Sequence, residues 1–195
     1  MSADPGVSAF ILAGGKSSRM GADKAFVRLD GRTLLQRALD ITRAVTSNVR
    51  IVGAAEKFAT FAPVVEDIFP GCGPLAGIHV ALRASETDLN FILAVDLPFV
   101  PPALIRFLIS KARGSTCTAT VPRMGERLQP LCAVYNRAFC DLAQRSLEAS
   151  RYRIDSLFAE TPTRLVEEHE LQSAGFTAQM FRNLNTPEQL AKASK

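Results

Sequence analysis

The residues best suited to chemistry lie in a glycine- and serine-rich stretch near the start of the chain. Gly14, Gly15 and Gly21 are interspersed with two serines, and two cations, Arg19 and Lys24, occupy the second half of the stretch. Glycines let the backbone approach a ligand closely because they lack a Cβ atom. Backbone N–H groups that turn inward beside two cations suit phosphate groups. The stretch therefore predicts a loop that binds a polyanion.

This loop differs from two well-known phosphate-binding loops. A Walker A loop needs a glycine five residues before its Gly-Lys pair, but Phe10 stands at that distance from Gly15. Nor does the stretch contain the Gly-x-Gly-x-x-Gly pattern of a Rossmann dinucleotide site. The alternative is a surface loop without a ligand. A loop directly after a first buried strand is, however, the usual ligand position in open α/β sheets, which favours the binding loop.

Asp96 is the most informative residue outside this loop. It follows the apolar run from Asn90 to Val95 and would lie at the carboxyl end of a central strand. That strand end opens onto the ligand crevice in an open α/β sheet, and a buried carboxylate without a partner is costly. Oxygen ligands beside phosphates suit Mg²⁺, which takes one or two carboxylates and keeps several waters. The alternative is an Asp that starts the following turn, but the position favours a metal ligand.

Three further positions are compatible with more than one role. Asp67 follows the apolar residues 64 and 65, so it would face the same crevice, or it would simply form a turn. The segment from Gly73 to Gly77 places small residues at a helix start, where N–H groups suit an anion, or where the helix packs closely on the sheet. Asn183 and Asn185 offer neutral donors and acceptors to a ligand, or they cap a last helix.

Alternating apolar patterns predict strands and helices in turn, which is typical of a mostly parallel sheet with helices on both faces. We expect strands at 7–12, 48–52, 63–66, 90–95, 118–122, 131–135 and 163–166, and helices at 34–44, 74–84, 102–113 and 137–149. Shorter helical turns are expected at 56–61 and 154–160, with irregular structure from 167 to 181. Capping boxes at Thr33–Gln36 and Thr186–Gln189 predict the starts of the first and last helices.

Composition excludes several classes of protein. The 195 residues suit one domain with a full core, and a net charge of +4 without a long Lys/Arg run does not favour nucleic acid. No apolar run is long enough to span a bilayer, and the first residues lack a signal-peptide pattern. The four cysteines form no Cys-x-x-Cys pair and there are two histidines, so a zinc site or disulfide framework is not expected. We expect a cytoplasmic protein.

Four motifs, in order, closely resemble those of the molybdenum cofactor guanylyltransferases, the MobA family. The first is the stretch from Leu12 to Lys24, which reads Leu-Ala-Gly-Gly-x-Ser-x-Arg-Met-Gly-x-Asp-Lys. The others are Gly73-Pro-Leu-Ala-Gly77, Ala94-Val-Asp96-Leu-Pro-Phe99 and Asn183-Leu-Asn185-Thr-Pro-Glu188. The resemblance spans nearly the whole chain. It implies a single nucleotidyltransferase domain over residues 1–195 with a three-layer, Rossmann-like fold of the nucleotide-diphospho-sugar transferase type.

The resemblance also implies roles for individual residues. The nucleotide would be bound by Leu12, Ala13, Gly14, Gly15, Lys24, Gly53, Asp67, Gly77 and Asp96. Catalytic roles are implied for Arg19, Lys24 and Asp96, with Mg²⁺ on Asp96. The pterin substrate is placed near Asn183 and Asn185. Many family members have Asn where this chain has Gly53, so a side-chain contact with the nucleotide would be lost here.

The implied reaction transfers GMP from GTP to the terminal phosphate of molybdenum-loaded molybdopterin and releases pyrophosphate. In such a transfer, catalysis is chiefly positioning and electrostatic stabilisation, for which Lys24 and Arg19 are suited. Relatives that use CTP typically have Leu-Ala-Ala-Gly where this chain has Leu12-Ala-Gly-Gly15. Three alternatives stay open: a molybdopterin cytidylyltransferase, another small nucleotidyltransferase such as one acting on sugar 1-phosphates, and a non-catalytic GTP-binding protein that delivers the cofactor. Transient contacts with a molybdopterin-supplying protein and a recipient molybdoenzyme are also left open.

Overall fold

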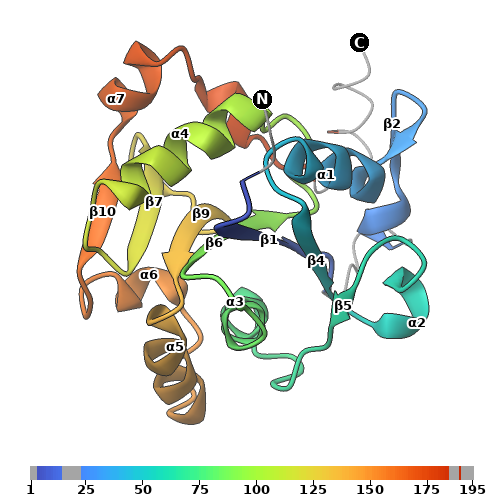
Figure 1. The fold of residues 1–195 in the computed structure, drawn as a ribbon, viewed down its shortest axis with the longest axis horizontal. Helices are drawn as coiled ribbons and strands as arrows, with labels where there is room; N and C mark the ends of the chain where they lie inside the picture. The colour runs from blue at the N-terminus through green and yellow to red at the C-terminus, as the bar shows by residue number, and fades with distance from the viewer. Residues whose placement is uncertain (1–3, 15–22, 185–188, 190–195) are drawn as a thin grey trace.

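The computed structural model describes residues 4–14, 23–184 and 189, and a mixed sheet lies at its centre (Figure 1). Its strands are β1 (Val7–Leu12), β4 (Asn48–Val52), β5 (Val64–Val65), β6 (Leu89–Ala94), β7 (Ala119–Met124), β8 (Arg127–Leu128), β9 (Cys132–Asn136) and β10 (Thr163–Val166). Their order is β10-β7-β9-β6-β1-β4-β5, and β8 pairs with β7. Strand β9 runs antiparallel to β6 and β7, whereas the other neighbours along this order are parallel. The predicted α/β class with a mostly parallel sheet is therefore confirmed.

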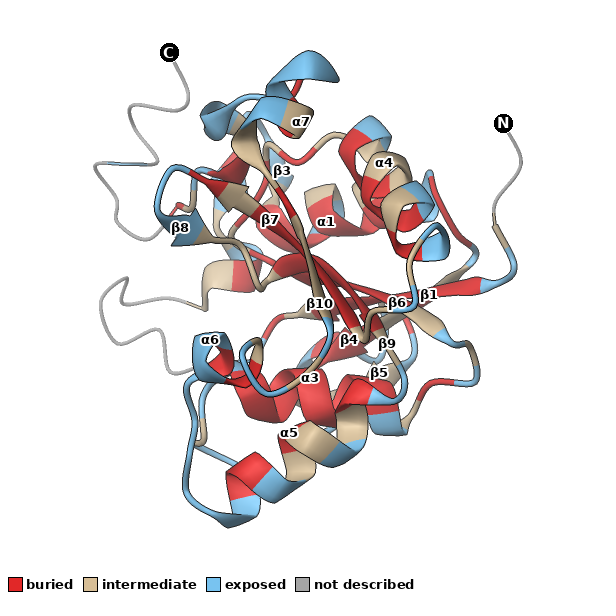
Figure 2. Ribbon diagram, turned by 90° about the vertical axis from the view of Figure 1, so that its left-hand side faces the viewer, coloured by how far each residue is buried: buried red, intermediate tan, exposed pale blue. Residues whose placement is uncertain are grey.

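Helices cover both faces of the sheet (Figure 2). One face carries α1 (Leu34–Arg43), α4 (Pro102–Arg113) and α7 (Glu168–Ser173), and the other carries α3 (Pro74–Arg83), α5 (Phe139–Glu148) and α6 (Ile154–Leu157). Successive strand residues point to opposite faces, so Ile11 and Leu93 join the first core whereas Phe10 and Ile92 join the second. Because both faces are covered, the central strands are apolar throughout their length.

The helices begin where local chemistry favours a start. At α1, the Gln36 N–H donates to Thr33 Oγ1 over 3.1 Å, and the Thr33 N–H donates to Gln36 Oε1 over 3.0 Å. This reciprocal pair is the predicted capping box. Helices α3 and α4 each begin on a proline, whose missing N–H would have had no partner in the first turn.

Some segments of the structure differ from the sequence expectations. Strands β2 (Arg28–Leu29) and β3 (Arg32–Thr33) form a hairpin that was not predicted. Its two-residue turn has a positive φ at both positions, 48° at Asp30 and 79° at Gly31, as a type I′ turn requires. The segment expected to be irregular contains α7 and a 3₁₀ helix, η2 (Ala178–Phe181). The predicted capping box at 186–189 lies largely outside the described residues.

Two observations concern features that the sequence disfavoured, namely a membrane-spanning helix and a metal site with histidine ligands. No helix among the described residues is long and apolar enough to cross a membrane. His79 on α3 is 0% exposed, and neither of its ring nitrogens makes a hydrogen bond with a described residue. Burial lowers the pKa of His79 below the ordinary imidazole value, although nearby Gln144 and the charge of Asp67 oppose this effect. His79 is therefore a neutral core residue.

The burial of His79 makes the stability of the protein depend on pH. Between the lowered pKa in the fold and the ordinary pKa near 6.5, the unfolded chain binds more protons at this site. The free energy of unfolding of the wild type should therefore fall as the pH is lowered from 7.5 to 5.5. Urea unfolding of His79→Gln across this range should show a weaker pH dependence. The exposed His169 provides the control, and an equal change in His169→Gln and His79→Gln would contradict this assignment.

Candidate functional site

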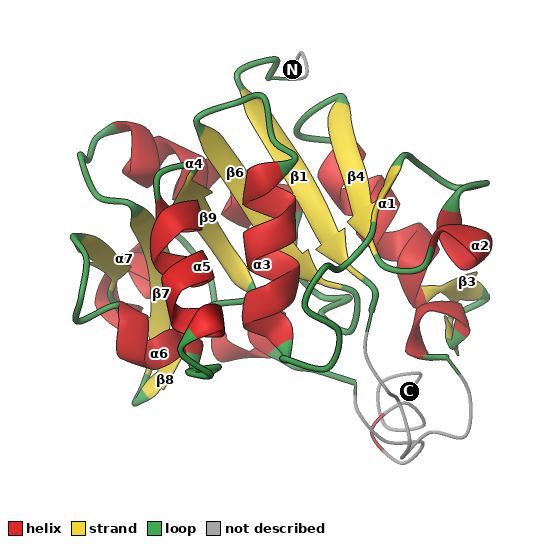
Figure 3. Cartoon of the chain, turned by 90° about the horizontal axis from the view of Figure 1, so that it is seen from below, coloured by secondary structure: helices red, strands yellow, loops and turns green. Residues whose placement is uncertain are grey.

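The carboxyl ends of three parallel strands, β6, β1 and β4, meet at one edge of the sheet (Figure 3). At the last register position, Leu12 on β1 pairs with Val52 on β4 and with Ala94 on β6. The N–H groups of Ala13 and Gly14 both donate to Val52 O, over 3.0 and 3.2 Å. The structure therefore brings Leu12, Ala13 and Gly14 to the strand ends, as the sequence predicted. Gly15 and Arg19, two further predicted site residues, lie outside the described residues.

Asp96 and Lys24 meet at this edge although 72 residues separate them. Asp96 follows β6, and Lys24 begins a short 3₁₀ helix, η1 (Lys24–Phe26). The Lys24 ammonium donates to Asp96 Oδ2 over 3.2 Å, and the two side chains are 26% and 15% exposed, respectively. The turn after β6 does not use this carboxylate, because the Leu97 N–H donates to Ala94 O instead. The structure thus favours a site role for Asp96 over the turn-forming alternative.

The second carboxylate oxygen of Asp96 suits a divalent cation. Oδ1 is buried and has no hydrogen-bond partner among the described residues. A buried polar atom without a hydrogen-bond partner costs free energy of folding. Its presence at the carboxyl end of a central strand, where open α/β sheets usually bind their ligands, therefore indicates a function. The described residues contain no cluster of three or more metal-binding side chains. The single Asp96 oxygen is chemically compatible with Mg²⁺, because this ion is commonly held by one or two carboxylates together with waters and substrate phosphates.

Two of the predicted glycines lie where other side chains leave little room. A Cβ atom on Gly53 would lie 2.7 Å from the ring of Phe58, which belongs to the short helix α2 (Ala55–Phe58). A Cβ atom on Gly77 would lie 3.3 Å from the side chain of Leu12, so α3 packs closely on β1. The close-packing alternative for the start of α3 is therefore observed. Contact of either glycine with a nucleotide stays a prediction.

Asp67 lies beyond β5 and is exposed. Its Oδ1 accepts a hydrogen bond from the Phe69 N–H over 2.8 Å, which is the turn-forming role that the sequence allowed equally.

Asn183 lies beside the site, because the neighbouring Leu184 N–H donates to Asp96 O over 3.0 Å. Asn185 is outside the described residues. The chain thus returns to the end of β6 at Leu184, while the role of Asn183 and Asn185 stays a prediction.

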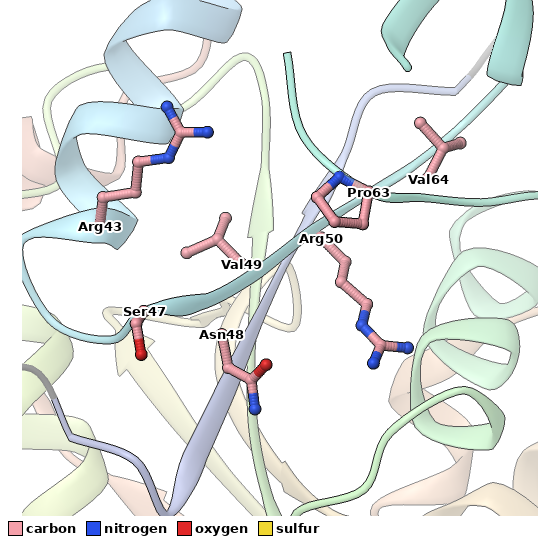
Figure 4. Close-up of a pocket in the computed structure, with 7 residues that line it drawn as sticks. All are labelled: Arg43, Ser47, Asn48, Val49, Arg50, Pro63 and Val64. Carbon is pink, nitrogen blue, oxygen red and sulfur yellow. The ribbon is translucent and has the colours of Figure 1, made fainter. Parts of the chain in front are cut away.

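A separate cavity lies away from these strand ends. It has a volume of about 290 Å³ and lies at the amino end of β4, between α1 and β5 (Figure 4). Arg43 and Arg50 line it, but their guanidinium groups already donate to the backbone carbonyls of Phe61 and Ala84, over 2.7 and 2.8 Å. This cavity lies at the opposite end of β4 from Val52 and Gly53, and the chemistry-bearing residues are not part of it.

Sequence reasoning assigned no role to two charged residues near Lys24. Asp23 and Lys57 form an ion pair of 2.9 Å beside η1, and Lys57 comes from α2. Asp23 belongs to the first motif, so its presence near the site was to be expected. No local pattern distinguishes Lys57 from other exposed lysines, because only the fold brings α2 next to η1.

The chain is similar to known proteins along nearly its whole length. The family model of the MobA-like NTP transferase domain matches residues 9–165. A probable molybdenum cofactor guanylyltransferase of Pelotomaculum thermopropionicum is 34% identical over 94% of this chain and 89% of its own length. A molybdenum cofactor guanylyltransferase of Desulfosudis oleivorans is also 34% identical, over 96% of this chain and 94% of its own.

The fold is also that of a solved relative. The molybdopterin-guanine dinucleotide biosynthesis protein A of Archaeoglobus fulgidus superposes with a TM-score of 0.85 at 26% identity, covering 96% of each chain. This likeness places the three-layer architecture among nucleotidyltransferases of the nucleotide-diphospho-sugar transferase type. The match of the family model over most of the chain, together with relatives above 30% identity along nearly its full length, shows that the chain belongs to the MobA-like NTP transferase family.

Proposed function

We propose that this chain, as a single domain of residues 1–195, transfers GMP from GTP to the terminal phosphate of molybdenum-loaded molybdopterin. A phosphate oxygen of the pterin attacks the α-phosphorus of GTP and forms a new P–O bond. The bond from the α-phosphorus to the oxygen bridging to the β-phosphate breaks, and pyrophosphate leaves with that oxygen. The observation that carries the proposal is the Lys24–Asp96 pair at the shared strand ends of a chain of this family.

Lys24 and Asp96 have complementary tasks in this proposal. The ammonium of Lys24 offsets the negative charge that develops on the phosphates during transfer. Asp96 holds Lys24 at the strand ends through Oδ2, and the unpartnered Oδ1 is the protein ligand for Mg²⁺. When bound there, Mg²⁺ neutralises phosphate charge and orients the nucleotide. Arg19 belongs to the same motif and is proposed to bind the leaving pyrophosphate.

The remaining predicted residues complete two substrate sites. Leu12, Ala13, Gly14 and Gly15 supply the backbone next to the nucleotide, with Gly53, Asp67 and Gly77 around it. Asn183 and Asn185 are proposed to bind the pterin, whose amide-like edge matches their donors and acceptors. The pterin phosphate is already an anion and supplies the attacking oxygen, so no protein nucleophile is required. We propose that the protein works in the cytoplasm.

Base choice is supported by the sequence of the loop and by the names of the relatives. The segment from Leu12 to Gly15 reads Leu-Ala-Gly-Gly, which matches the family members that use GTP. Both relatives described above are named as guanylyltransferases. A cytidylyltransferase is therefore the less favoured alternative.

The direct test is pyrophosphate release with Mg²⁺ and molybdenum-loaded molybdopterin, measured separately with GTP, CTP and ATP. Release that depends on GTP and on the pterin is the expected result. Release with CTP instead would keep the mechanism and overturn the base assignment. GTP binding without pyrophosphate release, using pterin shown to be loaded, would support the cofactor-delivery alternative and contradict the enzyme.

Replacing Lys24 by Met should lower the rate of GMP transfer by a factor on the order of 10²–10³, as loss of one preorganised electrostatic donor does in other enzymes. Lys111 provides a matched control, since it pairs with Glu170 over 3.0 Å at 33% and 18% exposure. Single-turnover rates of pyrophosphate release would compare Lys24→Met with Lys111→Met. Equal rates in the two variants would contradict the role of Lys24.

Gly53 should be required by packing in this chain, although many relatives have Asn at this place. A side chain there would displace the ring of Phe58, and overpacking of this kind costs about 1–3 kcal/mol. Urea unfolding should show this loss for both Gly53→Ala and Gly53→Asn. The control is Gly114→Ala, where the nearest atom to an added Cβ would be 3.7 Å away. The loss in Gly53→Asn should shrink in a Phe58→Leu background, and an unchanged loss would contradict the steric explanation.

A further inference from the structure

We propose that Asp23 and Lys57 are positioning residues that fix the segment carrying Lys24. The inference rests on the proposed function, because it assigns to an ion pair beside the site the task of orienting a catalytic side chain. It concerns a surface contact between η1 and α2, two elements that are 29 residues apart at their nearest ends. Three observations carry it: the two bonds of the Asp23 carboxylate, the aromatic contact next to it, and the attachment of α2 to the sheet.

The carboxylate of Asp23 uses both oxygens to hold η1. Oδ1 accepts a hydrogen bond from the Ala25 N–H over 3.2 Å, which caps the 3₁₀ helix that Lys24 begins. Oδ2 accepts one from Lys57 Nζ over 2.9 Å. This hydrogen bond and the charge of Asp23 raise the pKa of Lys57, so the ammonium stays charged. Lys24 therefore lies between Asp23, which is bonded to Lys57 of α2, and Ala25, which is 0% exposed.

An aromatic contact joins the same two elements. The rings of Phe26 and Phe58 stack with centroids 5.8 Å apart and an angle of 25° between their planes. Phe26 also contacts Phe61, with centroids 6.0 Å apart. Phe58 is 1% exposed whereas Phe26 is 40% exposed, so the buried ring of α2 supports the more exposed ring of η1. The segment from Asp23 to Phe26 is thus held on both sides of Lys24.

Helix α2 can serve as a support because it is itself fixed to the strand ends. The Gly53 N–H donates to Val65 O over 3.1 Å, which joins the start of this connection to β5. The Ala55 N–H, at the first position of α2, donates to Glu66 Oε1 over 3.0 Å. The absence of a side chain at Gly53 lets the ring of Phe58 lie against the strand end. The contacts therefore run from β4 and β5 through α2 to η1, and end at the Lys24–Asp96 pair.

The ion pair is well placed to affect rate rather than stability. The side chains of Asp23 and Lys57 are 28% and 50% exposed, and such surface pairs contribute little to folding. A catalytic charge that moves by about 1 Å, in contrast, can cost up to about 100-fold in rate. Loss of the Asp23–Lys57 pair should therefore lower kcat while the thermal midpoint and the KM for GTP change little.

The test measures kcat and KM for GTP in the pyrophosphate-release reaction, together with the thermal midpoint, for three single variants. Asp23→Asn keeps an oxygen that can cap Ala25 but removes the charge that pairs with Lys57. Lys57→Met removes the partner, and Lys57→Arg retains a cation. We expect kcat to fall about tenfold in Asp23→Asn and Lys57→Met, and to stay within about twofold of wild type in Lys57→Arg. The double variant Asp23→Asn/Lys57→Met should lose no more than either single change, because the two residues act as one unit.

Arg151→Met provides the control for the loss of an exposed ion pair. Arg151 and Glu160 lie 2.7 Å apart with side chains 49% and 38% exposed, on the α5–α6 side of the sheet. This variant should keep the wild-type kcat. An active wild type with wild-type kcat in both Asp23→Asn and Lys57→Met would overturn the inference and leave the proposed function intact. Equal losses in Lys57→Arg and Lys57→Met, or additive losses in the double variant, would also overturn it. A wild type without GTP-dependent release would instead refute the proposed function.

Discussion

One carboxylate, that of Asp96, sets the constraint on which the site depends. It lies at the end of a central strand, pairs with Lys24 through one oxygen, and keeps the other oxygen buried without a partner among the described residues. Folding alone would not favour such an arrangement, because an unpaired buried polar atom costs free energy. The surrounding contacts hold it nonetheless: β6 lies between β1 and β9, and the Leu184 N–H is bonded to Asp96 O. The sheet and the Leu184 contact therefore hold in place a carboxylate whose second oxygen the described residues do not satisfy.

Gly53 and helix α2 connect side-chain packing at the strand ends with the position of the segment that carries Lys24. Gly53 follows β4, and the ring of Phe58 lies so close to it that an added Cβ atom would be 2.7 Å away. The missing side chain at Gly53 therefore lets α2 pack closely against the strand ends. Through Phe26 and the Asp23–Lys57 pair, α2 in turn contacts the segment that carries Lys24. Close packing at Gly53 and the contacts of the segment that carries Lys24 are thus connected through α2.

Much of the fold could be predicted because apolar periodicity and helix caps are local signals. The strands at 7–12, 48–52 and 163–166 and the helix at 102–113 have the predicted bounds. The β2–β3 hairpin could also have been found, since Asp30-Gly31 is a strong two-residue turn signal. The motifs indicated that Leu12, Ala13, Gly14, Lys24 and Asp96 belong to one site, and the structure places these five residues at one strand edge. Lys57 could not be predicted, because its role depends on a tertiary contact. From the sequence, Asp67 and Gly77 were each compatible with two roles. Their contacts in the structure show a turn at Asp67 and close packing at Gly77.

The central claim is that Asp96 holds a divalent cation beside the nucleotide, and Mn²⁺ offers the most direct test because its anomalous scattering identifies it. Crystals of the protein with GTP and Mn²⁺ would be measured at a wavelength sensitive to manganese, alongside crystals of Asp96→Asn. The account predicts an anomalous peak within bonding distance of Asp96 Oδ1 and of a nucleotide phosphate, and its loss in the variant. Ordered GTP whose Mn²⁺ is bound only by phosphates and water, with Asp96 still paired to Lys24 alone, would contradict it.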